Sequence, residues 1–207
     1  MPPAFRVYLI TDRSLFPGKD GLYRAVEDAV EAGVRCVQLR EKDLPVRQVL
    51  DMAYRLRAIT AHHGAMLFIN ERVDVALAAK ADGVHLGAAG IPVKAARAAS
   101  GGRMLIGVSA HSVAETVEAG REGADFVTLG PVYETPSKMK YGPPVGTEVL
   151  RKAAAGAGVP VFAIGGIRPD RIGEVKGCGA YGVAVISAIL ASGDVKSSAE
   201  EFERLMK

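Results

Sequence analysis

The chain carries a series of polar residues, each placed at or just after the end of a short apolar segment. They are Gln38, Arg40, Lys42, Asn70, Ser109, Thr135, Ser137 and Lys138. Amide, hydroxyl and cationic side chains of these types hydrogen-bond to phosphate and carboxylate oxygens. His111 adds a group that exchanges a proton near neutral pH, so we take it as the candidate catalytic residue.

Two glycine-rich strand ends follow one another in the last third of the chain. Residues 161–167 read Val-Phe-Ala-Ile-Gly-Gly-Ile, and residues 182–188 read Gly-Val-Ala-Val-Ile-Ser-Ala. Each apolar run predicts a buried parallel strand that turns into a helix. A glycine pair lets a ligand approach the backbone, and a helix N-terminus offers free N–H groups to a phosphate. We therefore expect Gly165, Gly166, Ile186 and Ser187 to hold a substrate phosphate.

These residues need a scaffold that gathers strand ends, and the sequence predicts one. Strands are expected at 7–10, 36–39, 65–69, 83–86, 105–108, 126–129, 161–164 and 182–185. Amphipathic helices are expected at 22–32, 46–62, 73–79, 93–99, 113–122, 148–155, 169–176 and 199–206. Strands that alternate with helices in this way favour an α/β fold, a (β/α)8 TIM barrel in which residues 1–207 form a single compact domain. A doubly wound open sheet has the same rhythm and is the alternative.

Residues 131–146 break this rhythm, because the proline- and glycine-rich segment fits no helix. Long loops on a compact scaffold are commonly functional, and in a barrel this one would lie at the face that carries the active site. We expect Thr135, Ser137 and Lys138 to form a loop wall beside the substrate.

Composition excludes several function classes. The chain has 207 residues, is 49% hydrophobic and carries a formal charge of +3. Without a basic cluster, this small charge predicts neither a nucleic-acid nor a membrane partner. Cys36 and Cys178 are far apart and predict free thiols in a reducing compartment. No apolar run is long enough to span a bilayer, so a cytoplasmic location is expected.

Several candidates also have a purely structural interpretation. Arg40 and Lys42 could form surface ion pairs with Glu41 and Asp43, and Asn70 could cap the helix that follows it. Gln38 and His85 alternate with apolar neighbours and could point into the barrel as hydrogen-bonded interior residues. His111, Lys138 and Ser187 could likewise be a surface residue, a solubility charge and a helix cap.

The motifs, taken in order, resemble those of the thiamine phosphate synthase and TenI superfamily over nearly the whole chain. The carrying stretches begin at Tyr8 (Tyr-Leu-Ile-Thr-Asp), Val37 (Val-Gln-Leu-Arg-Glu-Lys), Phe68 (Phe-Ile-Asn), Ala81 (Ala-Asp-Gly-Val-His-Leu-Gly), Gly107 (Gly-Val-Ser-Ala-His-Ser), Gly130 (Gly-Pro-Val-Tyr-Glu-Thr-Pro-Ser-Lys), Ile164 (Ile-Gly-Gly-Ile) and Val185 (Val-Ile-Ser-Ala). The resemblance implies a TIM barrel that binds a phosphorylated thiazole, and barrels of this type are often homodimers.

Two activities occur in that superfamily. The synthase joins an aminopyrimidine pyrophosphate to a thiazole phosphate with Mg²⁺, and the TenI-type tautomerase aromatises a thiazole carboxylate phosphate without a metal. The synthase pattern implies an aspartate directly after Asn70 and another in a Gly-Gln-x-Asp stretch, but here Glu71 and Gly90 occupy those positions. This departure favours the tautomerase, with His111 moving the proton. The alternatives are the synthase, with Glu71 as metal ligand, and a non-catalytic regulator that binds thiamine precursors.

Overall fold

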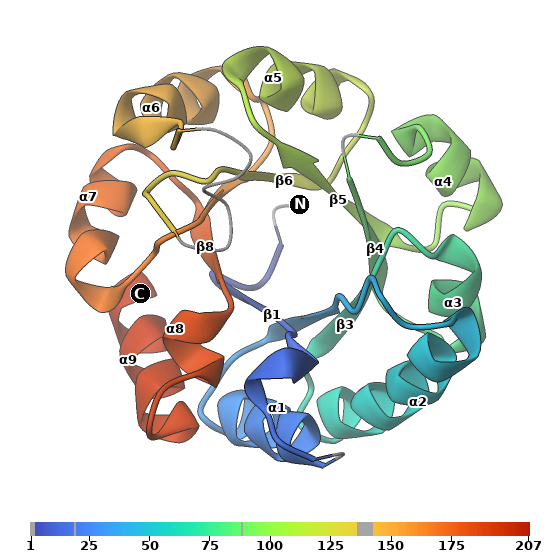
Figure 1. Ribbon diagram of the computed structural model, residues 1–207. Helices are drawn as coiled ribbons and strands as arrows, with labels where there is room; N and C mark the ends of the chain where they lie inside the picture. The colour runs from blue at the N-terminus through green and yellow to red at the C-terminus, as the bar shows by residue number, and fades with distance from the viewer. Residues whose placement is uncertain (1–2, 19, 88, 136–142) are drawn as a thin grey trace.

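A closed barrel of parallel strands forms the centre of the molecule, and helices surround it (Figure 1). The computed structural model describes residues 3–18, 20–87, 89–135 and 143–207. Its eight strands follow sequence order around the barrel, and β1 (Val7–Ile10) closes it by pairing with β8 (Gly182–Val185). The predicted TIM barrel is confirmed, and the open-sheet alternative is wrong because its edge strands would stay unpaired.

The element bounds agree closely with the sequence prediction. The remaining strands are β2 (Cys36–Leu39), β3 (Met66–Asn70), β4 (Gly83–Leu86), β5 (Leu105–Ala110), β6 (Phe126–Leu129) and β7 (Val161–Ile164). The helices are α1 (Gly21–Glu31), α2 (Val46–His62), α3 (Val73–Ala78), α4 (Val93–Ala99), α5 (Val113–Arg121), α6 (Gly146–Gly156), α7 (Ile172–Gly177), α8 (Ser187–Leu190) and α9 (Val195–Met206).

The differences have local causes. Strand β5 runs on to Ala110, which pairs with Leu129 of β6. Helix α9 begins earlier than predicted because the Asp194 carboxylate accepts a hydrogen bond from the Ser197 N–H at 3.0 Å, which caps it. The short segment η1 (Arg13–Leu15) was not predicted, the helix expected to follow residues 182–186 is the single turn α8, and the helix expected at 169–176 is divided into η3 (Pro169–Arg171) and α7.

Aromatic rings fill the end of the barrel interior away from the site. Phe126 lies among the rings of Tyr8, Phe68 and Phe162, with centroid separations of 5.4, 5.5 and 5.3 Å. Phe5, from the segment before β1, packs on the same cluster. Separations of this size suit tilted and edge-on aromatic contacts, so the cluster forms a densely packed, buried apolar base for the barrel.

Glycines on the neighbouring strands make room for these rings. A Cβ on Gly182 would lie 2.3 Å from the Phe162 ring, and one on Gly83 would lie 2.3 Å from the Phe68 ring. The rings therefore occupy the space that side chains at those positions would take. Because side chains alternate across a strand, the residue two positions after each inward residue also faces the interior, one layer nearer the C-terminal strand ends. That next layer is mainly polar.

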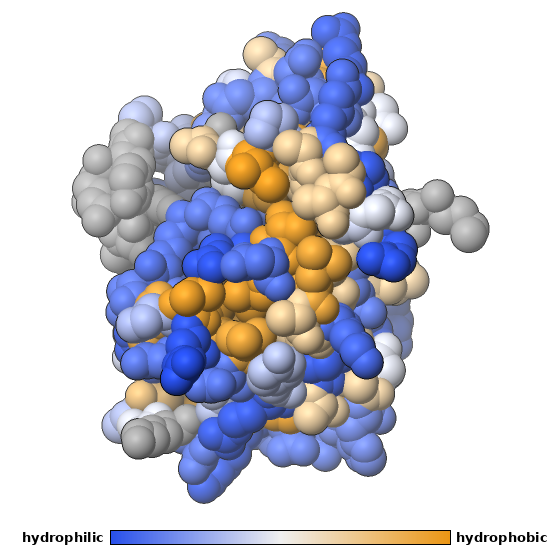
Figure 2. All heavy atoms as spheres, turned by 90° about the vertical axis from the view of Figure 1, so that its right-hand side faces the viewer, coloured by the Kyte–Doolittle hydropathy of each residue, from blue (hydrophilic) through white to orange (hydrophobic). Residues whose placement is uncertain are grey.

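The outer surface includes an apolar patch that the sequence did not single out. The patch lies on the side of the molecule where α2, α3 and α4 are found (Figure 2). Exposed large apolar side chains on this side of the fold include Tyr54 of α2, Leu77 of α3 and Ile91, which precedes α4. Both Cys36 and Cys178 are buried free thiols, as predicted. Within the described residues, no helix is both long and apolar enough to cross a membrane.

The contact between Gly182 and Phe162 gives a test of this packing. We expect Gly182→Ala to lower the unfolding free energy by about 2–3 kcal/mol, because the added methyl overpacks a core that cannot shift its backbone. Gly173→Ala is the matched control, since Gly173 lies in α7 with no atom within 4 Å of its Cβ position. That change should be neutral or stabilise the protein by roughly 0.5–1 kcal/mol. Equal urea midpoints for the two variants would contradict the packing described.

Candidate functional site

A cavity opens at the C-terminal ends of the barrel strands and encloses about 600 Å³ of space that is continuous with solvent. It is lined by Ile10, Gln38, Arg40, Asn70, His85, Ser109, Ala110, His111, Thr128, Gly130, Pro131, Ile164, Gly165 and Ile186. The structure thus brings together seven of the predicted site residues, namely Gln38, Arg40, Asn70, Ser109, His111, Gly165 and Ile186.

The other predicted residues are not found among those that line the cavity, or lie outside the described residues. Lys42, Glu71, Thr135, Gly166 and Ser187 are not among the residues that line the cavity. Thr135 is half-buried at the end of the described part of the loop. Ser137 and Lys138 lie outside the described residues, so their predicted place in a loop wall stays a prediction.

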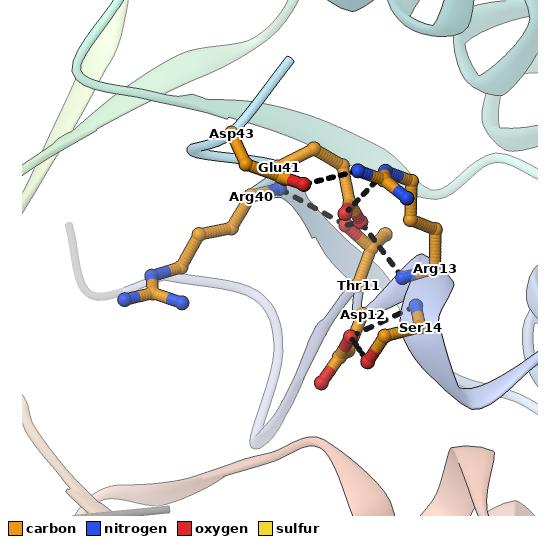
Figure 3. Close-up of polar contacts among 7 residues, drawn as sticks. All are labelled: Thr11, Asp12, Arg13, Ser14, Arg40, Glu41 and Asp43. Atoms are coloured by element: carbon orange, nitrogen blue, oxygen red, sulfur yellow. Dashed lines mark hydrogen bonds and ion pairs between the residues drawn. The ribbon is translucent and has the colours of Figure 1, made fainter.

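Arg40 extends into the cavity from the end of β2 (Figure 3). The buried side chains of Thr11 and Glu41 form a hydrogen-bonded bracket that holds its backbone. The Arg40 N–H donates to the Thr11 hydroxyl at 3.0 Å, and that hydroxyl donates to Glu41 Oε1 at 2.8 Å. The Arg40 side chain points away from this bracket, and its guanidinium forms no ion pair with any described residue. Its charge is therefore available to an anion in the cavity.

Glu41 is the buried centre of the bracket. Besides Thr11, it accepts a hydrogen bond from the Arg13 N–H at 3.1 Å, and the Arg13 guanidinium lies 3.7 Å from Glu41 Oε2. Burial raises the pKa of the Glu41 carboxyl, and the hydrogen bond from Thr11 partly offsets this effect. Arg13 also pairs with Asp43. The structural interpretation in which Glu41 and Asp43 pair with Arg40 and Lys42 is therefore wrong.

Lys42 pairs instead with Glu71, at 3.8 Å between Nζ and Oε1. Glu71 follows β3 with a φ of 61°, an uncommon conformation for a residue other than glycine. Its carboxylate lies over Gly87, where a Cβ would be 2.6 Å from Oε1. Asn70 lines the cavity, and the N-cap of α3 is Arg72, so the capping interpretation of Asn70 is wrong.

Buried polar side chains form the floor of the cavity. The Gln38 amide donates to the Tyr8 hydroxyl at 2.9 Å, and that hydroxyl lies 3.4 Å from His85 Nδ1. His85 Nε2 lies 3.0 Å from Ser109 Oγ and 3.3 Å from Thr128 Oγ1. Burial, together with the charge of Arg40, lowers the pKa of His85 to about 3. His85 is therefore a neutral imidazole near pH 7.

His111 occupies the rim of the cavity, and two hydrogen bonds orient it. Its Nδ1 lies 2.6 Å from the Gly130 carbonyl oxygen, and its backbone N–H donates to Glu115 Oε2 at 2.8 Å. Because a carbonyl only accepts, Nδ1 carries a proton and Nε2 is left to exchange one. This tautomer suits the proton-transfer role that the sequence predicts. Ser112 caps α5 through the Glu115 N–H, as the sequence motif indicates.

Close contacts with the segment after β6 require glycine at both positions of the pair that follows β7. Gly165 and Gly166 have φ values of 95° and 65°, and a Cβ on Gly165 would lie 2.5 Å from Pro131. A Cβ on Gly166 would lie 2.8 Å from the Glu134 carbonyl oxygen. The sequence argument from ligand approach therefore missed a second cause, which is the close packing of the segment after β6. Phosphate binding by this pair stays a prediction.

Sequence reasoning did not select several residues of the site. Thr128 is the clearest, because it is a polar inward residue in the otherwise apolar β6, and period-two alternation with Phe126 would have found it. Thr11 and Glu41 stand in motifs that the sequence analysis quotes, but their contact joins residues on two different strand ends and has no local signal.

Comparisons with known proteins find relatives that cover nearly the whole chain. Residues 7–189 match the family described as thiamine monophosphate synthase. A Geobacter sulfurreducens protein with a provisional thiamine-phosphate synthase assignment is 51% identical over 98% of this chain and 94% of its own length. The thiamine-phosphate synthase of Chloroflexus aurantiacus is 41% identical over 98% and 93%. The solved thiamine phosphate pyrophosphorylase of Pyrococcus furiosus is 37% identical, with a TM-score of 0.88, over 98% and 95%.

The bracket predicts a distinct response to two substitutions of Thr11. Thr11→Val removes the hydroxyl, which leaves the buried Glu41 carboxylate and the Arg40 N–H without this partner. We expect a loss of about 1–3 kcal/mol in unfolding free energy, the usual cost of an unsatisfied buried polar group. Thr11→Ser keeps the hydroxyl and should lose less than half as much. Urea titrations that rank the two variants in the reverse order would contradict the bracket.

Proposed function

Because this chain belongs to the thiamine monophosphate synthase family, we propose that it joins an aminopyrimidine diphosphate to a thiazole phosphate. The chain is an enzyme of thiamine biosynthesis. The reaction forms a bond between the pyrimidine methylene carbon and the thiazole nitrogen, and diphosphate leaves with the electrons of the broken carbon–oxygen bond. The names of relatives that are 41–51% identical support this activity above the tautomerase that the sequence motifs favoured.

The observation that carries the proposal is the Arg40 guanidinium in the cavity, which pairs with no side chain in the part of the chain that the structure describes. A leaving diphosphate bears several negative charges, and a planar guanidinium binds such oxygens through paired hydrogen bonds. Gly165 and Ile186, which directly precedes α8, also line the cavity and would suit the phosphate of the thiazole. Arg40 would hold the diphosphate end, while the polar floor orients the ring between the two anions.

Glu71 is the carboxylate that we assign to the magnesium ion that this family implies. Within the described residues, no cluster of three or more acidic, histidine or cysteine side chains could hold a metal. Glu71 is partly exposed, and Gly87 leaves room for its carboxylate. Magnesium sites commonly use one or two carboxylates and complete their coordination with phosphate oxygens and water. Glu71 fits that arrangement and would hold an ion that offsets charge on the diphosphate, while Lys42 supplies a second positive charge nearby.

The metal requirement gives one test. We expect Glu71→Gln to raise the Mg²⁺ concentration for half-maximal thiamine phosphate formation by at least about tenfold, a loss typical even of residues that only support a ligand. Asp43→Asn is the control, because Asp43 is on the neighbouring loop and pairs with Arg13. A Mg²⁺ dependence that is the same in both variants would remove Glu71 from the metal site.

The tautomerase remains a second candidate, on two observations. Gly90 offers no side-chain ligand where the synthase pattern has an aspartate, and His111 Nε2, at the cavity rim, has no hydrogen-bond partner among the described residues. Aromatisation of a thiazole carboxylate phosphate needs no leaving-group metal; it needs one group that moves a proton in a cavity that binds the phosphate. Arg40 would then orient the ring carboxylate.

A paired assay on the purified protein separates the two candidates. We expect thiamine phosphate to form from the two phosphorylated precursors, and a chelator to abolish the reaction. Aromatisation that resists chelation and falls by about 100-fold or more in His111→Asn would establish the tautomerase instead, since general acid–base groups contribute at least that much. Affinity for thiazole phosphate without turnover in either arm would indicate the precursor-binding regulator.

A further inference from the structure

The buried polar floor contains a chain of hydrogen bonds whose direction can be worked out. The Tyr8 hydroxyl is fully buried, and the described side chains that contact it are Gln38, at 2.9 Å, and His85, at 3.4 Å. The amide nitrogen of Gln38 donates to the hydroxyl oxygen. The single proton of the hydroxyl therefore has His85 Nδ1 as its acceptor, because an unsatisfied buried donor costs about 1–3 kcal/mol.

This direction fixes the tautomer of His85. A neutral imidazole has one N–H and one acceptor nitrogen. With Nδ1 accepting from Tyr8, the proton is on Nε2, which lies 3.0 Å from Ser109 Oγ. Burial, with the positive charge of Arg40, keeps the pKa of His85 at about 3, so the ring stays neutral throughout the pH range in which the chain would work. His85 therefore donates to Ser109.

The Ser109 hydroxyl then has its own hydrogen free. Ser109 is half-buried and lines the cavity, and His85 is the described side chain that its oxygen contacts. Since the oxygen receives the hydrogen bond from His85, the hydrogen is available to a group in the cavity. Thr128 Oγ1, at 3.3 Å from the same nitrogen, lies farther away than Ser109 and shares the donor.

We propose that Tyr8 and His85 are positioning residues, and that the chain from Gln38 through Tyr8 and His85 presents the Ser109 hydroxyl as a donor to the substrate. The substrate atom beside Ser109 is then an acceptor, an unprotonated oxygen or ring nitrogen, which is favoured over an N–H or O–H group because a donor would leave the Ser109 hydrogen without a partner. The inference rests on the proposed function in one respect, that Ser109 contacts the substrate.

The tautomer can be measured without any assay of activity. Nitrogen-15 NMR of the full chain labelled at histidine distinguishes a protonated from an unprotonated ring nitrogen, and the signals of His85 are those lost in His85→Gln. We expect an unprotonated Nδ1 and a protonated Nε2, unchanged from pH 6 to 8. A proton on Nδ1, or on both nitrogens, would mean that the series of hydrogen bonds runs in the opposite direction or is interrupted, and would overturn the proposal.

A double-mutant cycle tests the effect on the reaction. Tyr8→Phe keeps the ring and removes the donor to His85, and we expect kcat/KM to fall about tenfold, a change typical of one misdirected hydrogen bond. In a Ser109→Ala background the same substitution should have no further effect, because Tyr8 acts through Ser109. Additive losses would contradict this route.

Tyr181→Phe is the matched control. The Tyr181 hydroxyl donates to the Pro3 carbonyl oxygen, so this variant also loses a hydrogen bond of a partly buried tyrosine, with no contact to the polar floor. Equal losses of kcat/KM in Tyr8→Phe and Tyr181→Phe would assign Tyr8 a purely structural role. If the wild-type protein forms no thiamine phosphate, the proposed function fails. The NMR result still decides the direction of the hydrogen bonds from Gln38 to Ser109.

Discussion

The packing of aromatic rings against glycines inside the barrel is the constraint on which the rest of the structure depends. Phe162 and Phe68 occupy space that neighbouring strands leave open at Gly182 and Gly83. Gly107 does the same for Phe126 and also for His85, whose Nδ1 would lie 2.5 Å from a Cβ there. Because the rings close one end of the barrel, the next inward residues meet an apolar base on one side and the cavity on the other. Polar groups in that layer must therefore form hydrogen bonds with one another or with a ligand.

The polar groups between the aromatic cluster and the cavity meet this requirement in two ways. Gln38, Tyr8, His85 and Ser109 bond in series and leave one hydroxyl toward the cavity. Arg40 is handled differently, because the bracket of Thr11 and Glu41 holds its backbone and leaves its guanidinium unpaired among the described residues. The first arrangement restricts side-chain motion before a ligand arrives, and the second fixes the backbone from which Arg40 extends; both lower the entropy lost on binding.

Much of this could be predicted from the sequence, because the strands are short and their alternation is regular. The inward direction of Gln38 and His85 follows from their neighbours, and the cavity gathers seven of the predicted residues. Other features depend on contacts between distant segments. The bracket joins Thr11 to Glu41, and the glycine pair at 165–166 is needed by Pro131 and Glu134 as much as by a ligand. Helix α8 spans only Ser187–Leu190, which is too short to give a periodic signal.

The close contact between the segments after β6 and β7 also bears on how this fold can diverge. Any side chain at Gly165 would collide with Pro131, and a Cβ at Gly130 would lie 2.1 Å from the Ile164 carbonyl oxygen. A substitution at Gly130 or Gly165 is therefore blocked unless the facing segment has already changed. The two loops must therefore change together, so new specificity at this rim is expected to arise by replacing both of them at once.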